Sequence, residues 1–243
     1  MELESGTRAI VALAWARRLG LPDDALQKAA MGADAVRVHV PVDDGSLLLL
    51  RYLTGSVLAG PEWALDALEG YDDEALAGES ALVRALRATG RSEAEGLRTA
   101  GDYTLYYLDE PAGVEPSEQV AVSADPAYAQ RLVASCPSDD TIGLDLARGE
   151  HMFTLVADEQ QLPVATASYG LWEGLLADLA TLTLPDVRRH GLGAYITAVA
   201  ADDALTQGFT PQWRAPRSSA AAHRLAEDVG FVSVGSLTSA RLT

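Results

Sequence analysis

The amino-acid sequence predicts a mixed α/β protein with a mostly antiparallel sheet flanked by helices. Short segments of continuous or alternating apolar residues, typical of strands, are interleaved with longer segments in which apolar residues recur at helical spacing. In the second half, helices separate the later strand segments, which favours a mixed sheet. The chain of 243 residues is 48% hydrophobic, enough for a sizeable core.

The first half is expected to form a smaller α/β region, residues 1–115. The segment "DDGS" lies between two apolar runs and indicates a hairpin. The run "LLLLRYL" is interpreted as a buried strand, with a subunit contact as the alternative. The predicted elements of this half are helices over 7–20, 61–70 and 72–90, and strands over 36–42, 46–53 and 103–110.

A domain boundary is predicted at "EPAGVEP" (110–116), where two prolines and a glycine interrupt both periodicities. The second domain, residues 116–243, has a regular order of elements. Strands are predicted over 118–123, twice within 152–174, and over 175–184, 211–216 and 231–242; helices are predicted over 125–136, 191–208 and 218–230.

The charge of the chain excludes several classes of partner. The 18 Lys and Arg residues stand against 35 Asp and Glu, for a formal charge of −17. This charge repels phosphate backbones and anionic bilayers, so neither nucleic acid nor a membrane is expected as a partner. The acidic start with its short apolar run fits neither a signal peptide nor a membrane span, so a cytoplasmic location is expected. The single Cys136 and the dispersed histidines predict no disulfide and no metal site.

The residues "RRHGLG" (188–193) lie between a predicted buried strand and a predicted long helix. Backbone N–H groups at a helix start have no acceptor within the helix, and the helix dipole adds partial positive charge there. Gly191 and Gly193 lack the Cβ atoms that would keep a diphosphate from the backbone, and Arg188 and Arg189 add charge. The turn is interpreted as a pyrophosphate site; a solvated helix start with a packing glycine is the alternative.

Arg188, Gly191 and Gly193 match a short signature: arginine or glutamine, two residues, glycine, one residue, then glycine or alanine. With the order of elements around this turn, residues 117–243 resemble the GNAT (GCN-related N-acetyltransferase) superfamily, and the first half resembles the N-terminal extension of some bacterial members. The segment "SSAAAHRLAEDVGF" is similar to the family's closing segment, with Ser219 where asparagine is frequent. The resemblance implies acetyl-CoA as co-substrate and no metal.

The resemblance also implies which residues bind the cofactor. The backbone of the residues 182–184 would pair with the pantetheine arm, and the turn with the start of the following helix would hold the pyrophosphate. The implied cofactor-binding residues are Leu182, Thr183, Leu184, Arg188, Arg189, His190, Gly191, Leu192, Gly193, Ala194 and Ser219.

Asp178 is the leading candidate for the general base, because several family members carry a glutamate ten residues before the signature arginine. It has the strand parity of Leu182 and Leu184, so a regular strand directs all three side chains to one face, whereas a bulge would reverse this. Glu173, in the turn "WEG", is the alternative base.

Ala226 departs from the family pattern. It occupies the position of a tyrosine that in many members protonates the leaving thiolate, which an alanine cannot do. Tyr195 on the signature helix, or Tyr169 on the preceding strand, is a candidate substitute.

The resemblance implies a GNAT-type N-acetyltransferase that moves an acetyl or acyl group from acetyl-CoA to an amine by direct attack. The alternative is a non-catalytic GNAT-fold module that binds acyl-CoA or regulates a partner. The acceptor is expected to be a small-molecule or peptide amine, and the acidic surface favours a cationic one, such as a polyamine, an aminoglycoside or a lysine side chain. The sequence leaves a homodimer open.

Overall fold

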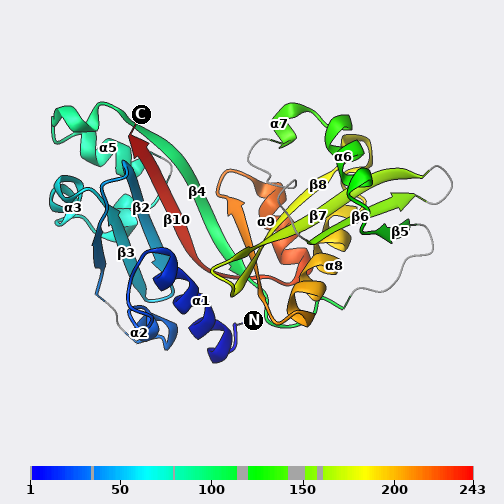
Figure 1. Ribbon diagram of the computed structural model, residues 1–243. Coiled ribbons are helices and arrows are strands. Elements are labelled where there is room, and N and C mark those ends of the chain that lie inside the picture. The colour runs from blue at the N-terminus through cyan, green and yellow to red at the C-terminus, as the bar shows by residue number, and fades with distance from the viewer. Residues whose placement is uncertain are drawn as a thin grey trace. The chain divides into compact units, whose positions relative to one another are not determined.

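The computed structural model describes residues 2–33, 36–78, 80–113, 120–141, 151–157 and 161–242 (Figure 1). The chain divides into two compact units. The N-terminal unit consists of residues 4–106, 215–220 and 233–243; the C-terminal unit consists of residues 1–3, 107–214 and 221–232.

This division differs from the boundary that the sequence predicts between 115 and 116. Residues 233–243 belong to the N-terminal unit because the last strand pairs with a strand of the first half, Leu237 with Leu50. A boundary inferred from local composition does not anticipate such distant pairing. The predicted boundary itself falls within 114–119, outside the described residues.

The strands of the N-terminal unit lie side by side in the order β1-β3-β2-β10-β4. Its strands are β1 (Val38–Pro41), β2 (Ser46–Tyr52), β3 (Gly55–Gly60), β4 (Leu97–Tyr107) and β10 (Val232–Leu242), and its helices are α1 (Ser5–Arg18), α2 (Gln27–Ala30), α3 (Glu62–Leu68), α4 (Asp73–Leu76), α5 (Ala81–Arg87) and the 3-10 helix η1 (Ser92–Ala94).

The predicted hairpin around "DDGS" is wrong. β3 lies between β1 and β2, parallel to the first and antiparallel to the second. The tight turn comes after β2 instead, at Leu53, which has a φ of 49°. β3 was not predicted from the sequence, and its residues are all buried. A fully buried strand needs neighbours that pair along both edges, so β3 takes the position between the other two.

The helix predicted over 72–90 is two helices. The Asp72 side chain caps α4 by accepting a hydrogen bond from the Ala75 N–H at 2.7 Å. Ala77 is extended and Gly78 has a φ of 126°, a conformation that ends a helix. α5 then begins at Ala81.

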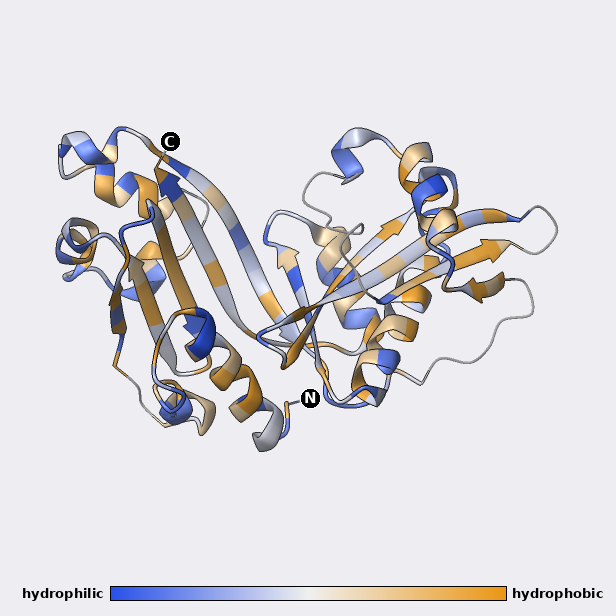
Figure 2. Cartoon of the chain, in the orientation of Figure 1, coloured by the Kyte–Doolittle hydropathy of each residue, from blue (hydrophilic) through white to orange (hydrophobic). Residues whose placement is uncertain are grey.

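Both faces of the N-terminal sheet are covered. Leu47 and Leu49 of β2 pack with Leu68 of α3 and with the apolar residues of α4 and α5 in one core cluster. Tyr52 is buried, and its hydroxyl donates to the Arg8 carbonyl of α1 at 2.6 Å. Burial on both faces explains the continuous leucine run of β2, and the apolar colour along β2 and β3 in Figure 2 follows it.

The strands of the C-terminal unit lie side by side in the order β9-β8-β7-β6-β5. Every element predicted after residue 117 is present, and α7 and the 3-10 helix η3 are additional. The elements are β5 (Val120–Ser123), α6 (Pro126–Ser135), α7 (Ser138–Thr141), β6 (His151–Ala157), β7 (Leu162–Trp172), β8 (Leu176–Thr183), η3 (Pro185–Val187), α8 (Leu192–Thr206), β9 (Thr210–Pro216) and α9 (Ala220–Val229).

Helices cover both faces of this sheet (Figure 1). On one face, the Thr181 hydroxyl of β8 lies 2.6 Å from the Thr197 hydroxyl of α8. On the other, Leu182 of β8 packs against Leu132 of α6. Successive residues of β8 therefore face different helices, as the period of a regular strand requires. The structure is a mixed, mostly antiparallel α/β fold, as predicted.

Candidate functional site

The central feature of the C-terminal unit is that β8 and β9 pair over only a short length. Their parallel ladder joins Leu176–Asp178 to Thr210–Gln212. Both strands continue beyond it, β8 to Thr183 and β9 to Pro216. Asp178 is thus the last β8 residue paired with β9. The next five residues of β8 belong to the ladder with β7 and not to the ladder with β9.

The unpaired edge of β8 can be assigned from the register. The Leu184 N–H donates to the Val164 carbonyl of the β7 side at 2.9 Å. Because backbone direction alternates along an antiparallel strand, even-numbered residues direct their N–H and C=O groups to β7. Leu179, Thr181 and Thr183 direct theirs to the opposite edge, where the ladder with β9 has ended. Of the three residues predicted to pair with pantetheine, only Thr183 presents its backbone at this edge.

The signature turn follows directly. η3 leads from β8 to Arg188, and two residues with positive φ then reverse the chain, Arg189 at 67° and Gly191 at 79°. Gly191 is the N-cap of α8, and no side chain of the described residues caps the helix there. The first N–H groups of α8 have no acceptor within the helix, which makes them donors for an anion.

The two glycines of the signature have different environments. A Cβ atom on Gly191 would meet nothing within 4 Å, so this glycine is needed for its left-handed conformation and leaves open space beside the turn. A Cβ atom on Gly193 would lie 3.0 Å from the Thr183 Oγ1 and 3.5 Å from the Leu225 Cδ1. Gly193 therefore permits close packing of α8 on β8 and α9.

The other predicted cofactor residues lie at the same turn, with one exception. Arg189 and His190 are exposed, and the His190 Nδ1 lies 3.1 Å from the Val187 carbonyl. Leu192 and Ala194 are half-buried in the first turn of α8. Ser219 belongs to the segment 215–220, which is part of the N-terminal unit.

Arg188 already has two partners. Its Nε donates to the Thr183 carbonyl at 3.1 Å, and its Nη2 donates to the Asp140 Oδ2 at 2.6 Å. Asp140 lies on α7, which the sequence analysis did not predict.

Asp178 is bound by two residues of β9. Its Oδ1 accepts from the Gln212 Nε2 at 3.0 Å and from the Arg214 Nε at 2.9 Å, and its Oδ2 accepts from the Arg214 Nη2 at 2.5 Å. The buried Tyr107 hydroxyl donates to the Gln212 Oε1 at 2.7 Å, which fixes the amide with its nitrogen toward Asp178. The guanidinium carbon of Arg214 lies 5.9 Å from the ring centroid of Trp172.

Glu173 follows Trp172 in the turn from β7 to β8. Glu173 and Gly174 both have positive φ, 53° and 65°, and the Leu175 N–H donates to the Trp172 carbonyl at 3.0 Å. Two consecutive residues with positive φ and this hydrogen bond form a tight turn, and the pairing of Trp172 with Leu176 leaves Leu175 as an extra residue in the hairpin. The Glu173 side chain is exposed.

The candidate acids lie elsewhere in the unit. Tyr169 is fully buried on the face covered by α8, and its hydroxyl donates to the Asp203 Oδ2 at 2.6 Å. Its register partner is Leu179, one residue after Asp178, so Tyr169 and Asp178 face opposite sides of the sheet. Tyr195 is half-buried on α8, and Ala226 is fully buried on α9.

Tyr169 is the centre of a second polar cluster. The His151 ring stacks on the Tyr169 ring with centroids 4.4 Å apart, and the His151 Nδ1 lies 3.6 Å from the Asp203 Oδ2. Burial, together with the hydrogen bond to and the negative charge of Asp203, raises the pKa of Tyr169 well above its ordinary value.

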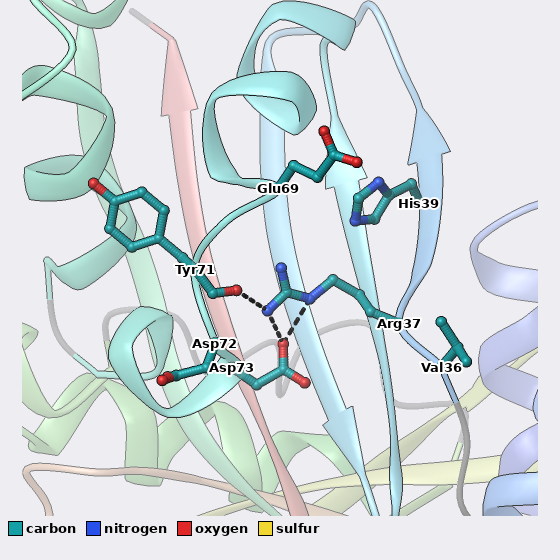
Figure 3. A pocket seen from close by; sticks show the side chains of 7 residues that line it. All are labelled: Val36, Arg37, His39, Glu69, Tyr71, Asp72 and Asp73. Carbon is teal, nitrogen blue, oxygen red and sulfur yellow. Dashed lines mark hydrogen bonds and ion pairs between the residues drawn. The ribbon is translucent and has the colours of Figure 1, made fainter.

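The N-terminal unit has a surface pocket of about 420 Å³, drawn in Figure 3. Its lining residues are Val36, Arg37, His39, Glu69, Tyr71, Asp72 and Asp73. The Arg37 Nε donates to the Asp73 Oδ1 at 2.7 Å, and its Nη2 donates to the Tyr71 carbonyl at 2.7 Å. Arg37 therefore joins the chain before β1 to the segment between α3 and α4, which is a structural role.

Within the described ranges, no group of three or more His, Cys, Asp or Glu side chains is arranged to hold a metal ion. None of the described helices has both the length and the apolar character needed to cross a bilayer.

No protein-family model matches the sequence, and no curated protein matches it. Solved structures do. A GCN5-related N-acetyltransferase-like protein from Streptococcus suis is 17% identical with a TM-score of 0.47, over 99% of this chain and 100% of that one. A Drosophila protein is 14% identical with a TM-score of 0.51, over 65% and 57% of the two chains. A GCN5-related N-acetyltransferase from Kribbella flavida is 20% identical with a TM-score of 0.44, over 66% and 63%.

The Drosophila protein, with a TM-score of 0.51, has a fold similar to that of this chain. At these identities the likeness concerns the fold, and activity has to be argued from the site. The features of this fold that bear on chemistry are the short β8–β9 ladder, the turn after β8 and the cluster around Asp178.

Four residues of the site were not predicted from the sequence: Arg214, Gln212, Tyr107 and Asp140. Gln212 and Arg214 alternate within "PQWRAP", a period that places both on one face of a strand, so this signal was present. Tyr107 and Asp140 carry no local signal, because each reaches its partner through distant pairing: Tyr107 to Gln212, and Asp140 to Arg188.

Proposed function

We propose that the C-terminal unit binds acetyl-CoA or a related acyl-CoA and transfers the acyl group to an amine. The observation that carries this proposal is the unpaired edge of β8 after Asp178, which leads directly into the turn at Arg188–Gly191 and the start of α8. An extended amide chain can pair with such a strand edge, and the turn next to it offers donors for phosphate.

The residues present fit this cofactor. Thr183 presents its backbone at the unpaired edge, where the amides of a pantetheine arm can pair. The uncapped first turn of α8 offers N–H groups, and Arg188, Arg189 and His190 offer side-chain donors for the pyrophosphate. When bound, the cofactor supplies an acyl group activated as a thioester.

The geometry supports a positioning role for Asp178. Both oxygens of its carboxylate accept hydrogen bonds from Arg214, so taking up a proton would disrupt the ion pair. Asp178 holds Arg214 at the end of the β8–β9 ladder, where an acyl group at the end of the pantetheine arm would come to lie. Glu173 in the adjoining turn stays the alternative base, and Tyr195 stays the alternative acid.

The second candidate function is a GNAT-fold module that binds acyl-CoA without turning it over. Two observations favour it. Ala226 is fully buried, so the position where many family members have a tyrosine offers no acid. The Asp178 carboxylate accepts hydrogen bonds from Arg214 and Gln212, which oppose its use as a general base.

For the acyltransferase function, we propose a small-molecule or peptide amine as the acceptor. The formal charge of −17 favours a cationic amine. Neither nucleic acid nor a membrane is proposed as a partner. A cytoplasmic location stays part of the proposal, which commits to no oligomeric state and is compatible with a homodimer.

Calorimetric titration with CoA, acetyl-CoA and 3'-dephospho-CoA tests the cofactor site. We expect Arg188→Ala to weaken binding of all three by about tenfold, since one charge-assisted contact to phosphate is lost. Arg84→Ala, an exposed arginine of α5 in the other unit, is the matched control and should leave affinity unchanged. A folded protein that binds none of the three compounds would overturn the proposal.

Release of free CoA in the presence of a panel of amines separates the two candidate functions. The enzyme releases CoA faster with its acceptor than without it. The binding module takes up acyl-CoA but releases CoA at the same slow rate with every amine.

A further inference from the structure

The arginine of the signature turn is tied to the protein at two points. The Arg188 Nη2 lies 2.6 Å from the Asp140 Oδ2, and the Arg188 Nε donates to the Thr183 carbonyl at 3.1 Å. The side chains of Arg188 and Asp140 are 41% and 30% exposed, so the ion pair lies at the surface within reach of a ligand.

The second tie is placed on the edge that the cofactor needs. Thr183 directs its carbonyl away from β7, toward the edge of β8 that has no ladder with β9. This is the carbonyl that an amide N–H of a pantetheine arm would use. Arg188 therefore binds two groups. One is the Thr183 carbonyl, which the pantetheine arm would use as an acceptor. The other is the Asp140 carboxylate, which occupies the guanidinium that a phosphate would bind.

We propose that Arg188 and Asp140 form a latch across the cofactor path, and that Asp140 competes with the phosphates of acyl-CoA for Arg188. The inference rests on the proposed function. On binding, the pyrophosphate takes the guanidinium from Asp140 and the pantetheine arm takes the Thr183 carbonyl. Asp140 thereby lowers cofactor affinity.

The strengths of the two interactions, Arg188 with Asp140 and Arg188 with a pyrophosphate, are compatible with such an exchange. An ion pair as exposed as Arg188 with Asp140 contributes little, because water and salt screen it. A pyrophosphate offers more negative charge and more acceptor oxygens than a carboxylate, and a guanidinium binds it through paired N–H groups. The Asp140 charge also adds to the repulsion of a polyanion by a protein of formal charge −17.

The alternative is that Asp140 orients Arg188 for phosphate binding. The two roles predict opposite signs for one substitution. If Asp140 competes, Asp140→Asn tightens binding; if Asp140 orients the arginine, the same change weakens it.

The experiment is calorimetric titration of five proteins with CoA and 3'-dephospho-CoA at low ionic strength: wild type, Asp140→Asn, Asp139→Asn, Arg188→Ala and the double variant Arg188→Ala/Asp140→Asn. We expect Asp140→Asn to bind both compounds about two- to fivefold more tightly than wild type. Asp139 is exposed on the same helix, so Asp139→Asn removes the same charge next to the pair and controls for long-range repulsion. Asp139→Asn should increase the affinity for both compounds less than Asp140→Asn does.

Compared with Arg188→Ala alone, the double variant should gain no more affinity than Asp139→Asn gains over wild type, because competition requires the arginine and only the long-range repulsion remains to be relieved. Equal or weaker binding by Asp140→Asn, or an equal gain from Asp139→Asn, would overturn the latch and leave the cofactor site intact. Absence of CoA binding by wild type and Asp140→Asn alike would overturn the cofactor site, and the latch with it.

Discussion

Asp178 on β8 and Arg214 on β9 form a two-point ion pair where their strands stop pairing, with Nε–Oδ1 at 2.9 Å and Nη2–Oδ2 at 2.5 Å. Gln212 is the register partner of Asp178, and Arg214 lies two residues further on the same face of β9. The pair fixes the orientation of the one carboxylate that the sequence analysis ranked first as a base. It changes the expected role of that carboxylate.

Removing the Asp178 charge should affect stability as well as turnover. We expect Asp178→Asn to lower the free energy of unfolding by about 1 kcal/mol, since Arg214 loses its partner at a half-buried position. Urea denaturation measures this, with Asp186→Asn, at an exposed position of η3, as the control. Arg214→Met should reduce turnover as strongly as Asp178→Asn does. Turnover that survives Arg214→Met but not Asp178→Asn would instead support Asp178 as the base.

Gly235 of β10 should tolerate no side chain. A Cβ atom there would lie 2.0 Å from the Arg51 carbonyl oxygen of β2, a contact with backbone that cannot rotate away. We expect Gly235→Ala to destabilise the N-terminal unit by about 2–3 kcal/mol, measured by urea denaturation. Gly170 of β7 is the matched control, since a Cβ atom there meets nothing within 4 Å. Equal stability of the two variants would contradict the tight pairing of β10 with β2.

The folded protein should lose stability in alkali through Tyr169. Its pKa is raised in the folded state by burial and by Asp203, whereas in the unfolded chain it ionises near pH 10. The stability that this shift contributes is therefore complete below about pH 10 and decreases as the pH rises further. Urea denaturation across this pH range should give a shallower decrease for Tyr169→Phe than for wild type. Parallel decreases in both proteins would show that Tyr169 ionises freely in the folded state.

The thiol of Cys136 should report on the pair formed by Arg188 and Asp140. Burial raises the pKa of Cys136, while the charge of Arg188 lowers it and that of Asp140 raises it. We expect Arg188→Ala to move the pH dependence of alkylation to higher pH and Asp140→Asn to move it to lower pH. The chain has one cysteine, so alkylation with iodoacetamide reads this site alone. Identical pH profiles in both variants would contradict the proximity of the thiol to the pair.

Much of the C-terminal unit could be predicted from the sequence. The order of strands and helices after residue 117 follows from apolar periodicity and from residues that start or end helices, such as Asp125, whose side chain caps α6. The turn at Arg188–Gly193 was also recognisable from the sequence, because its arginines and glycines are neighbours in the chain. Its two glycines proved to act differently, one through a positive φ and one through close packing.

The sequence by itself determined what is local: the elements, their order, and the short segments whose residues act together. Only the tertiary structure decided which distant segments meet. β3 lies between β1 and β2, β10 pairs with β2, Arg214 binds Asp178, and Asp140 binds Arg188. The physical reason is that strand register and helix docking depend on burial summed over the whole sheet, and no single segment carries that information.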